Sequence, residues 1–280
     1  MKLLILEDSV ALAKILSIKI SKELDMEIFI ANSFSEAKTL VEEHHFTIAT
    51  LDLYLSDAQE DEIVDYFLEK SIPSIIMTGS HDTALQERIS KKDIIDYILK
   101  DRAESIDYMI DHIQRVLKNQ SYTVLIADDS ALYRAQIKQI LSTQLLNTIT
   151  VKNGQEALEE IRNNTNISLL VTDYNMPVVN GLDLAITIRK QYKKDRFPII
   201  GISSDDITSI TFLKHGVNDF IRKPFFKEEL ATRVNNTLNA MENIQKLNSF
   251  AIKRVCLTDR VAHGPMDPDA FAALGRKLES

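Results

Sequence analysis

The chain has 280 residues, of which 45% are apolar and 26% charged, and its formal net charge is −8. This composition is that of a globular protein, and no apolar run approaches the roughly 20 residues that a membrane-spanning helix needs. Because no basic stripe stands out, we expect neither nucleic-acid binding nor membrane insertion. Cys256 is the only cysteine, which excludes an intrachain disulfide and indicates a reducing, cytoplasmic environment.

Short apolar runs alternate with helical patterns in the first part of the chain. The runs are rich in Ile, Leu and Val without polar alternation, which is typical of strands buried on both faces and hence of a parallel sheet covered by helices. Strands are predicted near 2–6, 27–31, 47–51, 73–77 and 94–98, and helices near 9–23, 34–44, 60–70, 82–91 and 103–118.

The same series returns about 121 residues later. The segment KLLILEDSVALAKIL at 2–16 lines up with TVLIADDSALYRAQI at 123–137, and Ser9 and Ser130 each stand where a helix N-cap belongs. The second series predicts strands near 123–127, 148–151, 168–172, 198–202 and 217–221. We therefore expect an α/β protein with two flavodoxin-like (βα)5 doubly wound parallel-sheet domains in tandem, over 1–119 and 122–240.

Residues 226–253 read as one long helix with an apolar stripe. Because the stripe continues past the second domain, residues 241–280 are assigned to a helical extension and a tail of unknown role. Two interpretations of this helix stay open: it packs on its own domain, or it is a signalling helix that pairs in a dimer or leads to an output domain. Pro265 and Pro268 favour a loop farther along. The stripe consists of Leu230, Val234, Met241, Ile244 and Leu247.

Acidic residues follow the first and third strands of each series. In each series one acid after the first strand and one after the third are 44 residues apart, and ligands of such sheets bind beyond these strand ends. Three carboxylates within about 5 Å repel by about 4 kcal/mol per pair, so a cation is expected among them. Oxygen ligands with room for water suit Mg²⁺. The predicted sets are Glu7, Asp8 and Asp52, and Asp128, Asp129 and Asp173.

Two further residue types complete each predicted site at the ends of the fourth and fifth strands. A hydroxyl there can contact a phosphoryl oxygen, and a lysine ammonium can pair with a carboxylate or phosphate. An aromatic residue three positions before each lysine lies on the opposite face of the strand. These residues are Thr78, Lys100 and Tyr97 in the first domain, and Ser203, Lys223 and Phe220 in the second.

With these motifs, both domains resemble receiver domains of two-component response regulators. The resemblance implies that Asp52 and Asp173 accept a phosphoryl group from a histidine kinase or phosphotransfer protein, with Mg²⁺ bound. It implies that Tyr54 and Asn175 give backbone carbonyls to the metal, and that the two aromatic residues switch conformation. It also implies a face of each domain that binds a partner or a second copy, so a homodimer through the receiver faces or the C-terminal helix is expected.

The second domain follows the loop pattern of that family more closely than the first. It has Pro177, Gly181 and a Lys223–Pro224 step, which is typically cis in the family. The loop geometry around Asp52 is therefore expected to differ, although the reacting groups are present. The acidic segment 56–62 beside it is either a solvated face or a brake on an anionic donor. At the three loop positions the first domain has Ser56, Glu60 and Asp101.

Three alternatives stay open. Tandem receivers followed by a helix resemble the input half of some diguanylate cyclases, which make cyclic di-GMP, but the Gly-Gly-Asp/Glu-Glu-Phe signature is absent and only a regulatory fragment would fit. A haloacid-dehalogenase-like phosphatase also uses an Asp nucleophile and Mg²⁺, but it needs a second Asp where Tyr54 and Asn175 stand. A phosphorylation-independent scaffold is the third. We expect no enzyme activity beyond self-phosphorylation.

Overall fold

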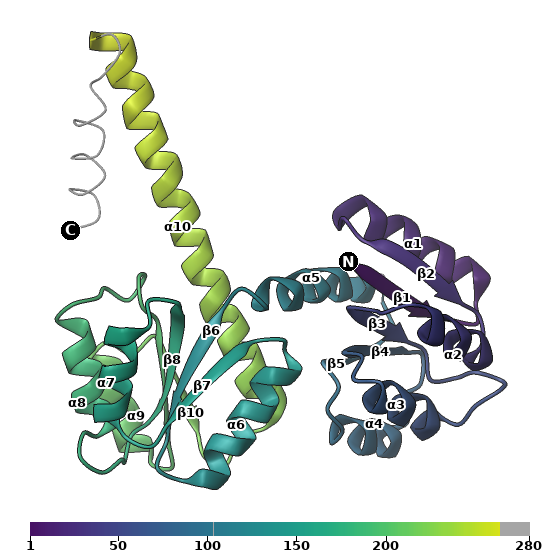
Figure 1. The fold of residues 1–280 in the computed structure, drawn as a ribbon, viewed down its shortest axis with the longest axis horizontal. Coiled ribbons are helices and arrows are strands. Elements are labelled where there is room, and N and C mark those ends of the chain that lie inside the picture. Colours follow the sequence, from purple (N-terminus) through teal and green to yellow (C-terminus); the bar gives the residue numbers. More distant parts are fainter. Residues whose placement is uncertain (103, 264–280) are drawn as a thin grey trace. The chain divides into compact units, whose positions relative to one another are not determined.

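The computed structural model describes residues 1–102 and 104–263, with residues 206–209 and 251–263 described by their backbone alone. The chain forms two five-stranded parallel sheets flanked by helices (Figure 1). The strand order is β2-β1-β3-β4-β5 in the first sheet and β10-β9-β8-β6-β7 in the second, which is one doubly wound order read from opposite edges. The predicted fold, two flavodoxin-like domains in tandem with a C-terminal helix, is confirmed.

The elements of the first domain end within two residues of their predicted bounds. Such agreement is expected where an apolar run ends at a polar or turn-forming residue. In chain order these elements are β1 (Lys2–Leu6), α1 (Val10–Glu23), β2 (Glu27–Ala31), α2 (Phe34–Glu43), β3 (Ile48–Leu51), α3 (Glu60–Glu69), β4 (Ser74–Thr78), α4 (Thr83–Ser90), β5 (Asp96–Leu99) and α5 (Glu104–Asn119).

The second domain repeats this alternation after a connection of three residues. Ser130 caps α6 as Ser9 caps α1, since each hydroxyl oxygen accepts a hydrogen bond from a backbone amide in the first turn of its helix. The elements are β6 (Thr123–Ala127), α6 (Ala131–Thr143), β7 (Asn147–Val151), α7 (Gly154–Asn163), β8 (Ile167–Asp173), α8 (Gly181–Arg189), β9 (Ile199–Ser203), α9 (Asp206–Lys214), β10 (Asp219–Arg222) and α10 (Lys227–His263).

The three central strands of the first sheet, β1, β3 and β4, are buried on both faces, as their uninterrupted apolar sequence predicts, whereas the edge strands β2 and β5 are only partly buried. Successive side chains of β1 point to opposite faces of the sheet. Leu4 and Leu6 therefore pack with residues of α2 and α3, whereas Leu3 and Ile5 pack with residues of α1 and α5. All four are at most 1% exposed, and the polar residues Glu7 and Asp8 follow directly at the C-terminal end of β1.

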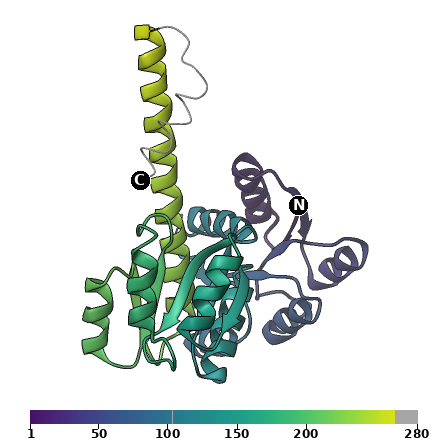
Figure 2. The ribbon, with the colours of Figure 1, turned by 60° about the vertical axis from the view of Figure 1, so that its left-hand side comes forward.

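The last helix is longer than predicted. It continues to His263 instead of residue 253, and it extends well beyond the strands of the second sheet in both views (Figures 1 and 2). Its apolar stripe is buried as far as Met241 and exposed from Ile244 onward. The loop predicted around Pro265 and Pro268 lies outside the described residues. Across the part of the chain that is described, no helix combines the length and the apolar character needed to cross a membrane.

Candidate functional site

Three of the predicted residues meet at the C-terminal edge of the first sheet. Leu6 of β1 pairs with Leu51 of β3, so the residues that follow them, Glu7 and Asp52, stand side by side. Lys100 follows β5 and reaches across this edge. Its ammonium donates hydrogen bonds to Glu7 Oε2 at 2.5 Å and to Asp52 Oδ2 at 2.6 Å.

The acidic residues of this first site are arranged as a metal site requires. Glu7, Asp8 and Asp52 each offer a carboxylate oxygen within 4.8 Å of the others. Glu7 and Asp52 are buried, whereas Asp8 is exposed. Burial raises the pKa of Glu7, and the hydrogen bond and charge of Lys100 oppose that rise. A hard cation that retains some of its water fits a set of oxygen ligands that is open on one side.

The second domain places the corresponding groups in the same way. Lys223 Nζ donates to Asp128 Oδ2 at 2.7 Å and to Asp173 Oδ1 at 2.6 Å. Asp128 and Asp173 are 0% and 7% exposed, whereas Asp129 is exposed. Among the described residues, only the first site brings three carboxylates as close together as a metal ion requires.

Burial and the lysine act in opposite directions on the second site. Burial raises the pKa of Asp173, while the hydrogen bond and positive charge of Lys223 lower it. For Lys223, burial disfavours the charged ammonium, but its hydrogen bonds to the two carboxylates outweigh burial and raise its pKa. One lysine therefore bridges the two buried acids and offsets part of the effect of burial on Asp173.

A buried hydroxyl ends the fourth strand of each site. Thr78 and Ser203 are 0% and 1% exposed. Each hydroxyl oxygen accepts a hydrogen bond at 3.3 Å from the backbone amide two residues later, that of Ser80 or Asp205. The hydroxyl groups of Thr78 and Ser203 therefore make the same local contact in the two domains.

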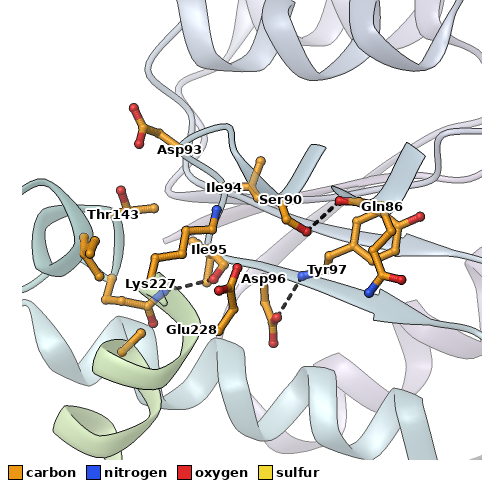
Figure 3. A pocket seen from close by; sticks show the side chains of 13 residues that line it. Gln86, Ser90, Asp93, Ile94, Ile95, Asp96, Tyr97, Thr143, Lys227 and Glu228 are labelled. Carbon is orange, nitrogen blue, oxygen red and sulfur yellow. Dashed lines mark hydrogen bonds between the residues drawn. The ribbon is translucent and has the colours of Figure 1, made fainter. Parts of the chain in front are cut away.

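The predicted switch residues lie on the fifth strands. Tyr97 is half-buried, and it lines a cavity of about 160 Å³ together with Gln86 and Ser90 of α4 (Figure 3). Its hydroxyl is buried and has no hydrogen-bond partner among the described residues. Burial raises the pKa of Tyr97, with smaller contributions from nearby groups that include Asp52. Phe220 occupies the matching position on β10 and is also half-buried.

The acceptor loops share one contact and differ in another. In both loops the amide two residues after the acceptor bonds the acceptor carboxylate: Asn175 N lies 2.8 Å from Asp173 Oδ2, and Tyr54 N lies 3.2 Å from Asp52 Oδ1. In the first loop a side chain adds a bond across the rim, from Tyr54 Oη to Ser80 Oγ at 2.7 Å. The Lys223–Pro224 peptide is cis, as the resemblance implied.

The acidic segment 56–62 of the first domain is largely used in specific contacts. Asp61 forms ion pairs with Arg88 and Lys92, and Asp57 binds the start of α2. Sequence reasoning treated these acids as a solvated face or a brake on a donor. The sequence did not predict these contacts, because the residues that bind Asp57 and Asp61 belong to other segments of the chain. No local pattern identifies which surface acid binds which helix end or which basic residue.

Gly181 is required by the packing of the acceptor loop of the second domain. Its amide donates to the carbonyl of Tyr174 at 2.9 Å, and a Cβ added here would overlap the backbone carbonyl of Asp173. We expect Gly181→Ala to lower the free energy of unfolding by about 2–4 kcal/mol, because backbone must move. Urea unfolding measures this.

The matched control for this prediction is Gly79→Ala in the first domain. A Cβ at Gly79 meets no atom within 4 Å, so its effect on stability should stay within about 0.5 kcal/mol. Equal stability of the two alanine variants would contradict the loop geometry described for the second domain.

A doubly wound sheet with a lysine bridging two buried acids at its edge defines the class of protein, and comparison with known families agrees. The response regulator receiver domain family matches residues 124–235. The chain belongs to this family.

Individual relatives show how far the similarity extends. The chemotaxis protein CheY1 of Helicobacter pylori is 37% identical over 114 residues, which are 40% of this chain and 92% of that protein. A chemotaxis protein CheY homolog of Campylobacter jejuni is 35% identical over 119 residues, which are 41% of this chain and 91% of that protein.

Two solved structures match more of the chain than one domain. Both are described as two-component system response regulator/GGDEF domain proteins, and both are 33% identical to this chain. The alignments cover 86% of this chain and 99% of each solved chain, with TM-scores of 0.78 and 0.76. Because this coverage exceeds either domain alone, the similarity includes both receiver domains.

Proposed function

We propose that the chain is a response regulator with two phosphoryl-accepting receiver domains, one over 1–119 and one over 122–240, followed by an extension over 241–280. Asp173 and Asp52 are the acceptors. The observation that supports this most strongly is the lysine-bridged pair of buried carboxylates at the strand ends, present once in each sheet.

The reaction that suits this site is phosphoryl transfer from a phosphohistidine of a histidine kinase or phosphotransfer protein. An Oδ atom of Asp173 forms a bond to phosphorus while the N–P bond of the donor breaks, and the donor imidazole keeps the electron pair and takes up a proton. Lys223 keeps Asp173 ionised and can follow the new negative charge onto the phosphoryl group. The buried hydroxyl of Ser203 is suited to donate to a phosphoryl oxygen.

The donor set of the first domain fits Mg²⁺, because its three carboxylates offer oxygens within 4.8 Å of one another and one of the three acids is exposed. The second domain carries acids at the matching positions. When bound, the ion would neutralise charge on the transferring oxygens. The backbone carbonyl two residues after each acceptor would complete the protein ligands. The proposed ligands are Glu7, Asp8, Asp52 and Tyr54 in the first domain, and Asp128, Asp129, Asp173 and Asn175 in the second.

Phosphorylation would shift each domain between two conformations. In the first domain, Thr78 would move toward the phosphoryl group and Tyr97 would rearrange. The buried hydroxyl of Tyr97, which has no hydrogen-bond partner in the described part of the chain, favours such a change, because an unpaired buried polar group costs stability. The face of α4, β5 and α5 would then bind a partner or a second copy. The exposed stripe of Ile244, Leu247 and Phe250 on α10 supports a homodimer through this helix.

Labelling with a small phosphodonor tests the proposal. Incubation with acetyl phosphate and Mg²⁺ should raise the intact mass by one or two phosphoryl groups, and borohydride trapping followed by peptide mapping should locate them at Asp173 and Asp52. Chelation of the metal should prevent labelling. Absence of any mass increase with acetyl phosphate, and again with a phosphorylated histidine-containing donor, would refute the proposed function.

A second candidate is that the two receivers regulate a diguanylate cyclase. The observation that favours it is the similarity across both domains to two response regulator/GGDEF domain proteins. Fusion of a GGDEF domain after α10 tests it. Cyclase activity should depend on phosphodonor and fall in Asp173→Asn, whereas activity that ignores the phosphodonor would exclude this candidate.

A further inference from the structure

Two glycines hold the acceptor loop of the second domain in place. Gly154, the first residue of α7, donates its amide to the carbonyl of Val179 at 2.9 Å, and Gly181 donates to the carbonyl of Tyr174 at 2.9 Å. A Cβ at 154 would lie 2.6 Å from Val179 O, and a Cβ at 181 would overlap the carbonyl of Asp173. Both contacts bring backbone so close that only glycine is tolerated.

The first domain has neither glycine. The residue that begins α2 is Phe34, whose side chain is 1% exposed in the core, and the residue that begins α3 is Glu60. In the described structure, no hydrogen bond joins the amide of Glu60 to Leu53, the counterpart of Tyr174. The acceptor loop of this domain must therefore be held in another way.

The carboxylate of Asp57 takes the place of the Gly154 contact, because it links the acceptor loop to the start of the preceding helix. Its Oδ1 accepts from the amide of Phe34 and its Oδ2 from the amide of Ser35, each at 3.0 Å. These are the first amides of α2, where a negative charge is also favoured by the helix dipole. The hydrogen bonds from Ser35 and Phe34 hold the pKa of Asp57 below its usual value, so both oxygens are acceptors at neutral pH. Val178 stands at this position in the second domain and offers no such side chain.

We propose that Asp57 is a positioning residue for the first acceptor site: by bonding the start of α2 it fixes the loop 52–59, a task that Gly154 performs at the start of α7 in the second domain. The loop carries Asp52 and Tyr54, whose amide bonds the acceptor carboxylate at 3.2 Å and whose carbonyl is a proposed metal ligand. Release of the loop should therefore lower the affinity of the first site for Mg²⁺, although every proposed ligand is still present. This inference rests on the function proposed for Asp52.

Amide hydrogen exchange of the loop tests the structural part. In Asp57→Ala, amides between residues 53 and 58 should exchange about tenfold faster, since two hydrogen bonds to a charged group are lost. Asp57→Asn retains one acceptor oxygen and should give an intermediate rate. Asp25→Ala removes the same charge from an exposed position of this domain and should leave the loop unchanged. Exchange at the wild-type rate in folded Asp57→Ala, or in Asp57→Asn should the alanine variant not fold, would overturn the proposal.

The Mg²⁺ dependence of labelling tests the functional part. In Asp57→Ala the Mg²⁺ concentration for half-maximal phosphorylation of Asp52 by acetyl phosphate should rise roughly fivefold, because a carbonyl ligand is less well placed. The Mg²⁺ concentration for half-maximal phosphorylation of Asp173 in the same chain should stay at its wild-type value. An unchanged Mg²⁺ concentration for half-maximal phosphorylation of Asp52 would overturn the proposal. Failure of Asp52 to become labelled in the wild-type chain would instead refute its proposed function, and the exchange measurement would then decide whether Asp57 holds the loop.

Discussion

Asp173→Asn is expected to lower phosphoryl incorporation in the second domain by roughly 10³-fold or more, the scale of loss seen when a nucleophile is removed. The amide oxygen of Asn is a far weaker nucleophile than a carboxylate, and the substitution leaves the size of the buried side chain almost unchanged. Lys223 would keep its bond to Asp128, so the variant should remain folded. The measurement is site-resolved mass spectrometry after labelling with acetyl phosphate and Mg²⁺.

The matched control for this result is Asp52→Asn, which should lose label in the first domain alone. The double variant should take up no phosphoryl group at either site. Wild-type labelling of the second domain in Asp173→Asn would show that another residue is the acceptor. Normal signalling by the double variant in cells would favour the phosphorylation-independent scaffold.

Lys223→Met is expected to lower the free energy of unfolding by about 3–5 kcal/mol near neutral pH without divalent cations. The reason is that Asp128 and Asp173 are both buried and Lys223 is the group that bridges them. Removal of the ammonium leaves two carboxylates that repel each other in a site with little water. Urea unfolding measures the loss, and Lys190→Met, an exposed lysine of the same domain, is the control.

The loss of unfolding free energy in Lys223→Met should depend on pH in a defined direction. Burial raises the pKa of Asp173 above 3.8, so the folded state binds this proton more tightly than the unfolded state. The contribution of such a group to stability is greatest below the unfolded pKa and decreases as pH rises through the folded pKa. Without Lys223 the folded pKa rises further, so the variant should be less destabilised near pH 5 than near pH 7.

Divalent cations provide an independent check on the same variant. Added Mg²⁺ binds the folded state and should restore part of the lost stability by mass action. A Lys223→Met chain as stable as Lys190→Met at neutral pH would contradict a stabilising role for the bridge that Lys223 forms between the two buried acids.

The sequence alone determined the series of strands and helices and the set of reacting groups. Strand and helix ends depend on local periodicity and on caps such as Ser9 and Ser130, and a parallel sheet places whatever follows its strands at one edge. Those two facts are sufficient to bring Asp52 beside Glu7, and the repeat at about 121 residues supplied the second site.

Only the tertiary structure decided how the groups at each edge are held. Asp57 lies next to the start of α2, 23 residues earlier in the chain, and no local pattern encodes that contact. The apolar stripe of α10 is continuous in sequence, yet its buried part ends near Met241. These features depend on how elements pack after each has formed, because which surface acid, helix end or apolar side chain is covered is set by distant residues that meet only in the folded chain.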